Sequence, residues 1–296
     1  MTTRLPPQLP IVVETTFNVP AGGEAGPGAN SGALGTSAGP SNLSDLINKY
    51  RAPMWVDEIR IGATNYSDFF SVFTQTSTRI LFGRYPMTRE FVPSSVLAPR
   101  WPGDGQIVIR LHKPLYITPQ ALPLPTIRSN VSLQIRFSLV GRLAVNLPQD
   151  AKIWVPYVTA FQGATTTAGT VSTQQSNRVD LANPFLTPFT ARFFLGYRTV
   201  DTHAGSLTPI GQGLANNAPP MTVRVTNHLG RPVVRDPTPF FDLFNVRDQA
   251  WAINSVVERG GYFVANVDVD ATNSFDDQQF NMSMFGYREE NIQWGT

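Results

Sequence analysis

The chain is a nearly unbroken series of short segments rich in β-branched and aromatic residues, each bounded by proline, glycine or another turn residue. The clearest are Ile107–Leu111, Val131–Val145, Arg192–Tyr197, Met221–Val225 and Tyr262–Val269. Such residues favour strands, and Pro and Gly mark the turns between them. No stretch shows the apolar period of a long amphipathic helix. The sequence therefore predicts an all-β fold.

The segment 131–145 shows the period of two that a half-buried strand produces. One face is predicted to hold Val131, Leu133, Ile135, Phe137 and Leu139. Pro53–Ala63 is expected to be a strand with Trp55, Ile59 and Ile61 on one face. Further predicted strands are Ile11–Val19, Phe69–Phe73, Arg79–Tyr85 and Ile107–Thr118, the last broken at Lys113-Pro114. The stretch Phe240–Val257 is the least β-like, with a short helix expected near Phe241–Val246.

Two tracts have few side chains that could form a core. Pro20–Asn42 is rich in Gly, Ala, Ser, Pro and Asn, and it is interpreted as a flexible arm because burial cannot offset its ordering entropy. Gln162–Asn177 is interpreted as a long exposed loop. Ser44–Lys49 could form one helical turn.

These features divide the chain into an N-terminal strand with its arm, a first β-barrel, a second barrel or inserted tower, and C-terminal strands that could complete the first barrel. The corresponding ranges are 1–50, 51–147, 148–257 and 258–296. A weak internal echo supports two barrels in tandem. Pro53–Gly62 resembles Pro188–Gly196, and Ile107–Leu115 resembles Thr222–Val233.

Charged residues make up only 15% of the chain, whereas about 25% is usual for a globular domain. A chain with few charges either exposes a neutral polar surface or buries much of its surface against partners. The net charge is +2 and no run of Lys or Arg occurs, which argues against direct nucleic-acid binding. The 20 arginines outnumber the three lysines, either through codon bias or because the planar guanidinium suits subunit interfaces.

The chain contains no cysteine, so disulfides, thiolate catalysis and Cys-based metal sites are excluded. This favours a bacterial or phage origin over a secreted eukaryotic one. Met1–Pro10 lacks the pattern of a signal peptide, and no window of about 18 apolar residues predicts a membrane span.

No motif predicts a catalytic site. Gly35-Thr-Ser-Ala-Gly39 matches the hydrolase pattern G-x-S-x-G, but it lies in the Gly/Ala/Ser tract without a preceding strand. His112, His203 and His228 have no metal-binding spacing and are interpreted as surface or turn residues. No P-loop, dinucleotide-binding or zinc pattern is present, and no cofactor is expected.

Two groups of carboxylates remain as candidates. Asp268, Asp270 and Asp276 are a weak candidate for a calcium site, because hard oxygen ligands at alternate positions suit Ca²⁺. A polar hairpin explains the same residues equally well. The couplets Asp57-Glu58 and Glu289-Glu290 could suggest glycosidase carboxylates, but adjacent residues of a strand face opposite ways. They are better interpreted as solvated charges or as partners for arginines.

Together these properties resemble viral capsid proteins built from jelly rolls. The runs Ala52–Ile61 and Ile107–Ile117 look like the early strands of major capsid proteins of tailless, icosahedral, membrane-containing bacteriophages. Length, arginine bias and missing cysteines are similar to the larger of two major capsid proteins of thermophilic-bacterium phages. The resemblance implies jelly-roll-type β-barrels, a base barrel and a tower barrel, a second capsid protein as partner, and an internal lipid membrane beneath the shell.

The hypothesis from sequence is therefore a non-enzymatic capsid subunit that self-assembles in the host cytoplasm and resides in the virion. A first alternative is a carbohydrate-binding or carbohydrate-active β-sandwich that uses Trp101, Trp154 or Trp251 as stacking platforms. A second is a capsid protein of a small RNA virus, against which stands the single cation, Arg4, in residues 1–42. Most of the 19 phenylalanines are expected in the core, with a minority at subunit interfaces.

Overall fold

The structure, a computed structural model, divides the chain into two compact units. Unit 1 comprises Met1–Phe91, Pro102–Pro156 and Glu289–Thr296, and unit 2 comprises Val92–Trp101 and Tyr157–Arg288. The residues that the structure describes are 10–27, 54–83, 85–88, 90–97, 105–118, 122–143, 152–164, 175–183, 185, 187–202, 206–209, 221–243, 250–269 and 278–291.

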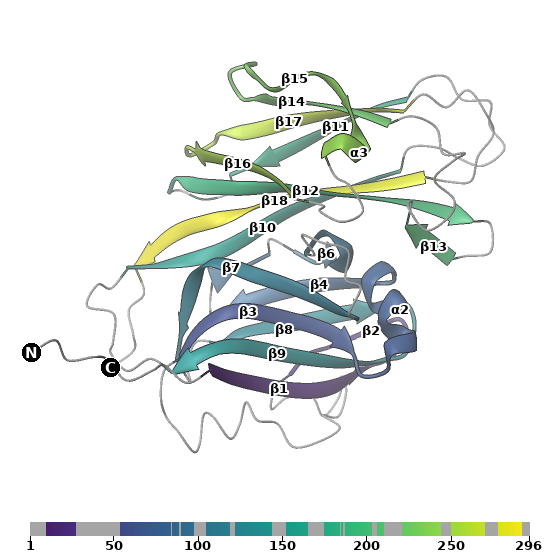
Figure 1. The fold of residues 1–296 in the computed structure, drawn as a ribbon, viewed down its shortest axis with the longest axis vertical. Coiled ribbons are helices and arrows are strands. Elements are labelled where there is room, and N and C mark those ends of the chain that lie inside the picture. Colours follow the sequence, from purple (N-terminus) through teal and green to yellow (C-terminus); the bar gives the residue numbers. More distant parts are fainter. Residues whose placement is uncertain are drawn as a thin grey trace, which may run out of the picture. The chain divides into compact units, whose positions relative to one another are not determined.

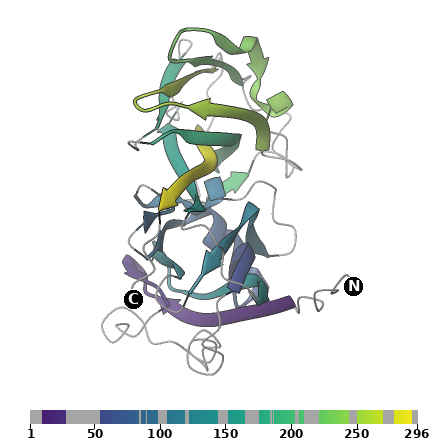
Figure 2. The ribbon, with the colours of Figure 1, turned by 90° about the vertical axis from the view of Figure 1, so that its left-hand side faces the viewer.

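Unit 1 contains two antiparallel sheets (Figure 1). Its strands are β1 (Pro10–Val19), β2 (Gly23–Ala25), β3 (Met54–Ala63), β4 (Thr76–Phe82), β5 (Tyr85–Pro86), β7 (Gln106–Ile117), β8 (Pro123–Ser129) and β9 (Leu133–Leu143). Sheet 1 has the order β1-β9-β3-β7, and sheet 2 has the order β2-β8-β4-β5. Figure 1 and Figure 2 both show β1, in purple, along one edge of sheet 1.

Unit 2 also contains two sheets. Its elements are β6 (Val92–Pro93), η3 (Ser94–Leu97), β10 (Lys152–Ala164), β11 (Gln175–Ala182), β12 (Phe189–Thr202), β13 (Ser206–Pro209), β14 (Met221–Asn227), β15 (Pro232–Pro239), α3 (Phe240–Leu243), β16 (Ala250–Val257), β17 (Tyr262–Val269) and β18 (Gln278–Asn291). One sheet has the order β10-β18-β12, with β16 and β13 both paired to β12, and the other has the order β11-β17-β14-β15. Strands β17 and β18, which follow residue 258, thus pair with strands of unit 2.

The two units share one strand order. When the main strands of each unit are numbered from 1 to 8 along the described chain, leaving out β6 and β13, one sheet is 1-8-3-6 and the other is 2-7-4-5 in both units. This pair of Greek keys folded into two facing sheets is the jelly roll. The all-β, jelly-roll-type fold predicted from the sequence is confirmed.

Each unit has an apolar core built from alternate residues of its strands. In unit 1 the buried residues of sheet 1 include Val13, Phe17, Ile59, Ile61, Phe137 and Leu139, and those of sheet 2 include Ile80, Phe82 and Ile127. In unit 2 one cluster joins both sheets, with Phe189, Phe194, Met282 and Met284 from one and Val223, Val225, Ala265 and Val267 from the other. Burial of this apolar area is the main force that holds each pair of sheets together.

A one-residue β-bulge interrupts the third strand of each unit, opposite a glycine of the eighth strand. In unit 1, Val56 pairs with Gly141 and Glu58 pairs with Val140, so Asp57 is the extra residue. In unit 2, Ala191 pairs with Gly286 and Phe193 pairs with Phe285, so Arg192 is the extra residue. The glycines have a shared physical reason, because a Cβ at Gly141 would overlap the carbonyl oxygen of Trp55 and one at Gly286 would overlap that of Thr190.

The bulge corrects the predicted face of β3. An extra residue inverts the alternation, so Met54 and Val56 are buried before the bulge, and Ile59 and Ile61 are buried after it. Trp55 therefore does not share a face with Ile59 and Ile61, as the period of two had predicted. Strand β7 also differs from prediction, since it runs through Lys113-Pro114 and accommodates the pair by a register shift between Leu115 and Arg110.

The first sequence echo falls on equivalent strands. Aligning Pro53 with Pro188 places Val56-Asp57-Glu58 of β3 on Ala191-Arg192-Phe193 of β12, which are the bulge residues of the two units. The second echo does not correspond in this way, because β7 belongs to the 1-8-3-6 sheet of its unit, whereas β14 and β15 belong to the 2-7-4-5 sheet of theirs.

Three predicted elements have a different structure. Phe69–Phe73, expected as a strand, lies in helix α2 (Phe69–Thr74), which follows the 3-10 turn η2 (Tyr66–Asp68) and buries Val72 and Phe73. Strand β16 occupies the end of the stretch that was expected to be the least β-like, whereas the helix expected near Phe241 is present as α3. Strand β2 lies within the tract that was interpreted as a flexible arm.

Other predictions fall wholly or partly outside the described residues. Residues 28–53, which include the helical turn expected at Ser44–Lys49, are not described. The second polar tract is described only at its ends, where β10 continues to Ala164 and β11 begins at Gln175.

We expect Gly141→Ala and Gly286→Ala each to lower the free energy of unfolding by about 1–3 kcal/mol, because the nearest overlapping atom in each case is a backbone carbonyl oxygen, which cannot rotate away. The measurement is differential scanning calorimetry of the full chain. Gly22→Asn and Gly260→Asn are the controls, since both glycines have positive φ and open space around a Cβ, and Asn tolerates that conformation. Alanine variants as stable as these controls would contradict the packing argument.

Candidate functional site

The acidic couplet Asp57-Glu58 lies at the bulge of β3, on the side of sheet 1 that faces away from the core. Both side chains are partly exposed, between the buried residues Val56 and Ile59. The sequence prediction that the two carboxylates face opposite ways is wrong, because the extra residue of the bulge turns both outward.

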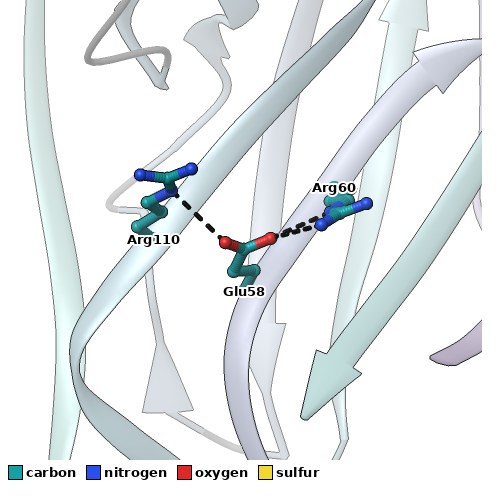
Figure 3. Close-up of polar contacts among 3 residues, drawn as sticks. All are labelled: Glu58, Arg60 and Arg110. Carbon is teal, nitrogen blue, oxygen red and sulfur yellow. Dashed lines mark hydrogen bonds and ion pairs between the residues drawn. The ribbon is translucent and has the colours of Figure 1, made fainter. Parts of the chain in front are cut away.

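Glu58 holds two arginines at once (Figure 3). Its Oε2 accepts hydrogen bonds from Nε and Nη2 of Arg60 at 3.0 and 2.6 Å, and its Oε1 lies 3.3 Å from Nε of Arg110. Arg60 lies two residues along the same strand face, and Arg110 is the cross-strand partner of Glu58 on β7. Both carboxylate oxygens are thus engaged in ion pairing, which agrees with the interpretation of the couplet as a partner for arginines.

The surrounding surface, here called the outer face of sheet 1, is rich in arginine. It consists of the outward residues Val12, Glu14, Thr16 and Asn18 of β1, Gln134, Arg136, Val140 and Arg142 of β9, Trp55, Asp57, Glu58 and Arg60 of β3, and Val108 and Arg110 of β7. Nη2 of Arg142 lies 3.9 Å from Oδ1 of Asp57. Glu14 and Arg136 make no ion pair in the described part of the chain.

A second cluster, on the outer side of sheet 2, was not found by sequence reasoning. The ring of Phe91 contacts two guanidinium groups, with the Cζ of Arg128 at 3.8 Å and that of Arg79 at 4.9 Å from its centroid. Arg128 also donates from Nε to Glu24 at 2.7 Å, across the β2–β8 pair. The only sequence signal is that Arg79 and Arg128 occupy outward positions of strands, and register is needed to bring them together.

The calcium candidate is not assembled in the described residues. Asp268 lies inside β17, paired with Ser176 of β11 and Thr222 of β14, rather than in a loop. Asp270 and Asp276 lie outside the described residues, so their part of the prediction stays a prediction. Over the described ranges, no group of three or more His, Cys, Asp or Glu residues is arranged to hold a metal ion.

The remaining polar candidates are scattered. His228 is exposed at the β14–β15 turn, and the centroid of its ring lies 6.3 Å from that of Tyr262. His112 lies in β7. His203 and the Gly35–Gly39 motif lie outside the described residues. Glu289 and Glu290 lie near the end of β18. No helix in the described ranges is long and apolar enough to cross a membrane.

The tryptophans proposed as sugar platforms have other contacts. The ring of Trp251 stacks on Phe194 with centroids 5.9 Å apart and packs against the core of unit 2. The ring of Trp154 has Nζ of Lys113 at 3.6 Å from its centroid. Trp101 lies outside the described residues.

Tyr116 is the titratable group of sheet 1 with a shifted pKa. It follows the bulge of β7, is completely buried, and meets Trp55 edge to face with ring centroids 5.0 Å apart. Burial raises the pKa of its phenol above the ordinary value of 10.0, because the ionised form loses hydration.

Comparisons with known proteins find similarity in structure only. No protein-family model and no curated protein matches the sequence. The STIV major capsid protein matches with 11% identity and a TM-score of 0.44, over 94% of this chain and 96% of that chain. The major capsid protein P2 of bacteriophage PM2 matches with 10% identity and a TM-score of 0.44, over 96% and 100%. A chain of the Sputnik virophage matches with 8% identity and a TM-score of 0.39, over 98% and 88%.

These matches include major capsid proteins, the class that the sequence resembles. At such identities and TM-scores a match does not transfer function from one protein to another. The function proposed below therefore rests on the strand order and the surfaces of this chain.

We expect Phe91→Leu to lower the free energy of unfolding by about 1–2 kcal/mol, because two cation–π contacts of about 0.5–1 kcal/mol each are lost while apolar bulk is kept. Phe91→Ala should cost more, since it also removes buried area. Urea unfolding of both variants measures the difference. If the leucine variant is as stable as the parent protein, the guanidinium contacts contribute nothing.

The raised pKa of Tyr116 predicts a loss of stability in alkali. The folded state holds the phenolic proton more tightly than the unfolded state, so this contribution is complete below pH 10 and is lost as the pH rises through the raised folded pKa. We expect Tyr116→Phe to unfold with a shallower pH dependence than the parent above pH 10, measured by urea midpoints at successive pH values. Parallel curves for the two proteins would disprove the assignment.

Proposed function

We propose that this chain is a structural subunit of an icosahedral viral capsid, a phage major capsid protein that assembles with copies of itself and with a second capsid protein. The observation that supports this most strongly is the tandem arrangement of two jelly rolls with one strand order and the same bulge. Jelly rolls serve in viral capsids, lectins and cupins, so the fold narrows the choice without deciding it.

The surfaces favour the capsid among these three. Cupins and lectins concentrate metal ligands or sugar-binding groups in one site. In the described part of unit 1, the ion pairs are instead distributed over the outer sides of two sheets, with Glu58 and Asp57 on sheet 1 and Glu24 on sheet 2. A sheet surface that carries arginines, valines and a tryptophan suits contact with another protein surface.

Several finer features belong to the proposal and come from the sequence resemblance. They are a second capsid protein as partner, an internal lipid membrane beneath the shell, assembly in the host cytoplasm and residence in the virion. Direct contact with the genome is not proposed, because residues 1–42 contain only the cation Arg4 and the net charge is +2. The proposed role requires no cofactor.

The carbohydrate-binding β-sandwich remains the second candidate. Two results would favour this second candidate: binding of a glycan in solution, and protection of the tryptophan fluorescence from quenching by that glycan. The packing of Trp251 on Phe194 and of Trp154 under Lys113 leaves less ring surface for such a ligand.

We expect the purified chain to grow from monomers of 32.5 kDa into defined multimers or closed particles as its concentration rises. Light scattering and negative-stain electron microscopy at several salt concentrations, with and without lipid vesicles, measure this. Contacts of standard size bury about 1,600 Å² in total, and many such contacts give steep concentration dependence. A monomer under all conditions, combined with saturable glycan binding, would overturn the proposal.

A further inference from the structure

The outer face of sheet 1 has the composition of a contact surface. It carries four arginines and no lysine, and between them lie Trp55 and three valines. Arginine and aromatic residues are enriched in protein interfaces, whereas lysine is depleted. Val12 is 53% exposed, which is unusual for a large apolar side chain in a strand and leaves apolar area for a partner to cover.

Arg110 is oriented toward solvent by its contact with Glu58. Only Nε faces the carboxylate, at 3.3 Å, and the two terminal nitrogens point away from it (Figure 3). The side chain is 70% exposed. A guanidinium fixed through Nε still presents its two terminal N–H groups in the planar geometry that matches a second carboxylate.

The opposite edge of the same face supplies such a carboxylate. Glu14 is exposed on β1 and makes no ion pair in the described part of the chain. Of the four β1 residues on the outer face of sheet 1, only Glu14 is charged, and its charge is negative. Of the two β7 residues on this face, only Arg110 is charged, and its charge is positive. The two edges of sheet 1 are therefore of opposite charge.

This charge pattern is self-complementary. A two-fold axis parallel to the strands, lying in the plane between two such faces, places β1 of one copy over β7 of the other and preserves position along the strands. Glu14 then approaches Arg110, one row away, and the same pairing recurs on the other side of the axis. Contacts that repeat in this reciprocal way define an isologous interface.

The area of the face is sufficient for a specific but weak contact. Four strands spaced about 4.8 Å apart and about ten residues long at 3.4 Å each cover roughly 650 Å². Two copies would bury about 1,300 Å², at the low end of stable protein interfaces. Such a contact would form at high local concentration rather than between dilute monomers.

We propose that the outer face of sheet 1 docks against the same face of a second copy of this chain, with Arg110 of each copy paired to Glu14 of the other. This inference rests on the proposed function and names one contact of the assembly. The occupant is a second copy because the exposed acid and the exposed arginine that complement one another are both present on this face.

The test is a charge exchange between two variants. Arg110→Glu alone should weaken self-association at least tenfold in sedimentation velocity, since it opposes two carboxylates, and Glu14→Arg alone should do the same with two cations. A mixture of the two variants should recover the parent affinity, because only mixed contacts then join opposite charges. Arg224→Glu and Glu258→Arg, exposed in unit 2, are controls with the same change of net charge.

Chemical crosslinking detects the contact even if the association is too weak for sedimentation. The chain has no cysteine, so Val12→Cys and Val108→Cys introduce single thiols on β1 and β7 without changing a charge. A short thiol-reactive crosslinker should join the two variants when they are mixed at high concentration, and should join neither variant efficiently to itself. Circular dichroism of every variant verifies that it is folded.

The outcomes separate this inference from the proposed function. A protein that assembles normally while the charge variants have no effect and no crosslink forms overturns the inference alone. Equal weakening by Arg110→Glu and Arg224→Glu also overturns it, because the effect is then one of net charge. Loss of binding to anionic vesicles by Arg110→Glu, with self-association unchanged, assigns the face to lipid headgroups instead. A parent protein that neither associates nor crosslinks overturns the inference, and saturable glycan binding by that monomer overturns the proposed function as well.

Discussion

The structure of each unit depends on the close approach of a glycine to a bulged strand. The eighth strand of each jelly roll lies between the first and third strands, and Gly141 or Gly286 is the residue that faces the bulge. Any larger side chain would overlap the carbonyl oxygen of the third strand. Because the bulge inverts the alternation of that strand, this contact also decides which residues enter the core.

The same constraint creates the charged face of unit 1. Without the extra residue at Asp57, the alternation that buries Met54 and Val56 would also bury Glu58 and Arg60, and unpaired buried charges are costly. With the bulge, Glu58 turns outward and lies across from Arg110. In unit 2 the bulge likewise leaves Arg192 and Phe193 partly exposed between the buried residues Ala191 and Phe194.

The fold class could be predicted because it depends on residue type and spacing. The run Leu133–Leu139 keeps a strict period of two, and the structure buries Leu133, Ile135, Phe137 and Leu139 as expected. The faces of β3 could not be predicted, because a bulge depends on the partner strand and leaves no local pattern. Helix α2 was mistaken for a strand because its phenylalanines and valine have high β-propensity, whereas packing of Val72 and Phe73 decides its conformation.

The elements that carry little side-chain signal were missed for a related reason. Strand β2 is three residues long and is held by backbone pairing with β8, which composition cannot indicate. Strand β16 has exposed Ala252, Asn254 and Val256 along one side, and Asn254 has a φ of 45°. The candidate clusters could not be predicted for the same reason. The contacts of Glu58 with Arg110 and of Arg128 with Phe91 each involve residues far apart in sequence, which only the register of the paired strands brings together.

The arginine bias has a physical use in this architecture. On the outer side of a sheet, a guanidinium can lie on an aromatic ring, as on Phe91, or reach a neighbouring strand, as Arg110 reaches Glu58. Individual exposed ion pairs contribute only about 0–1 kcal/mol, so these arginines add little to the stability of the subunit itself. Their effect is to hold donors in fixed positions at the surface. In the capsid that we propose, each contact can then be weak and reversible while its geometry stays specific, so that incorrectly placed subunits can leave before the shell closes.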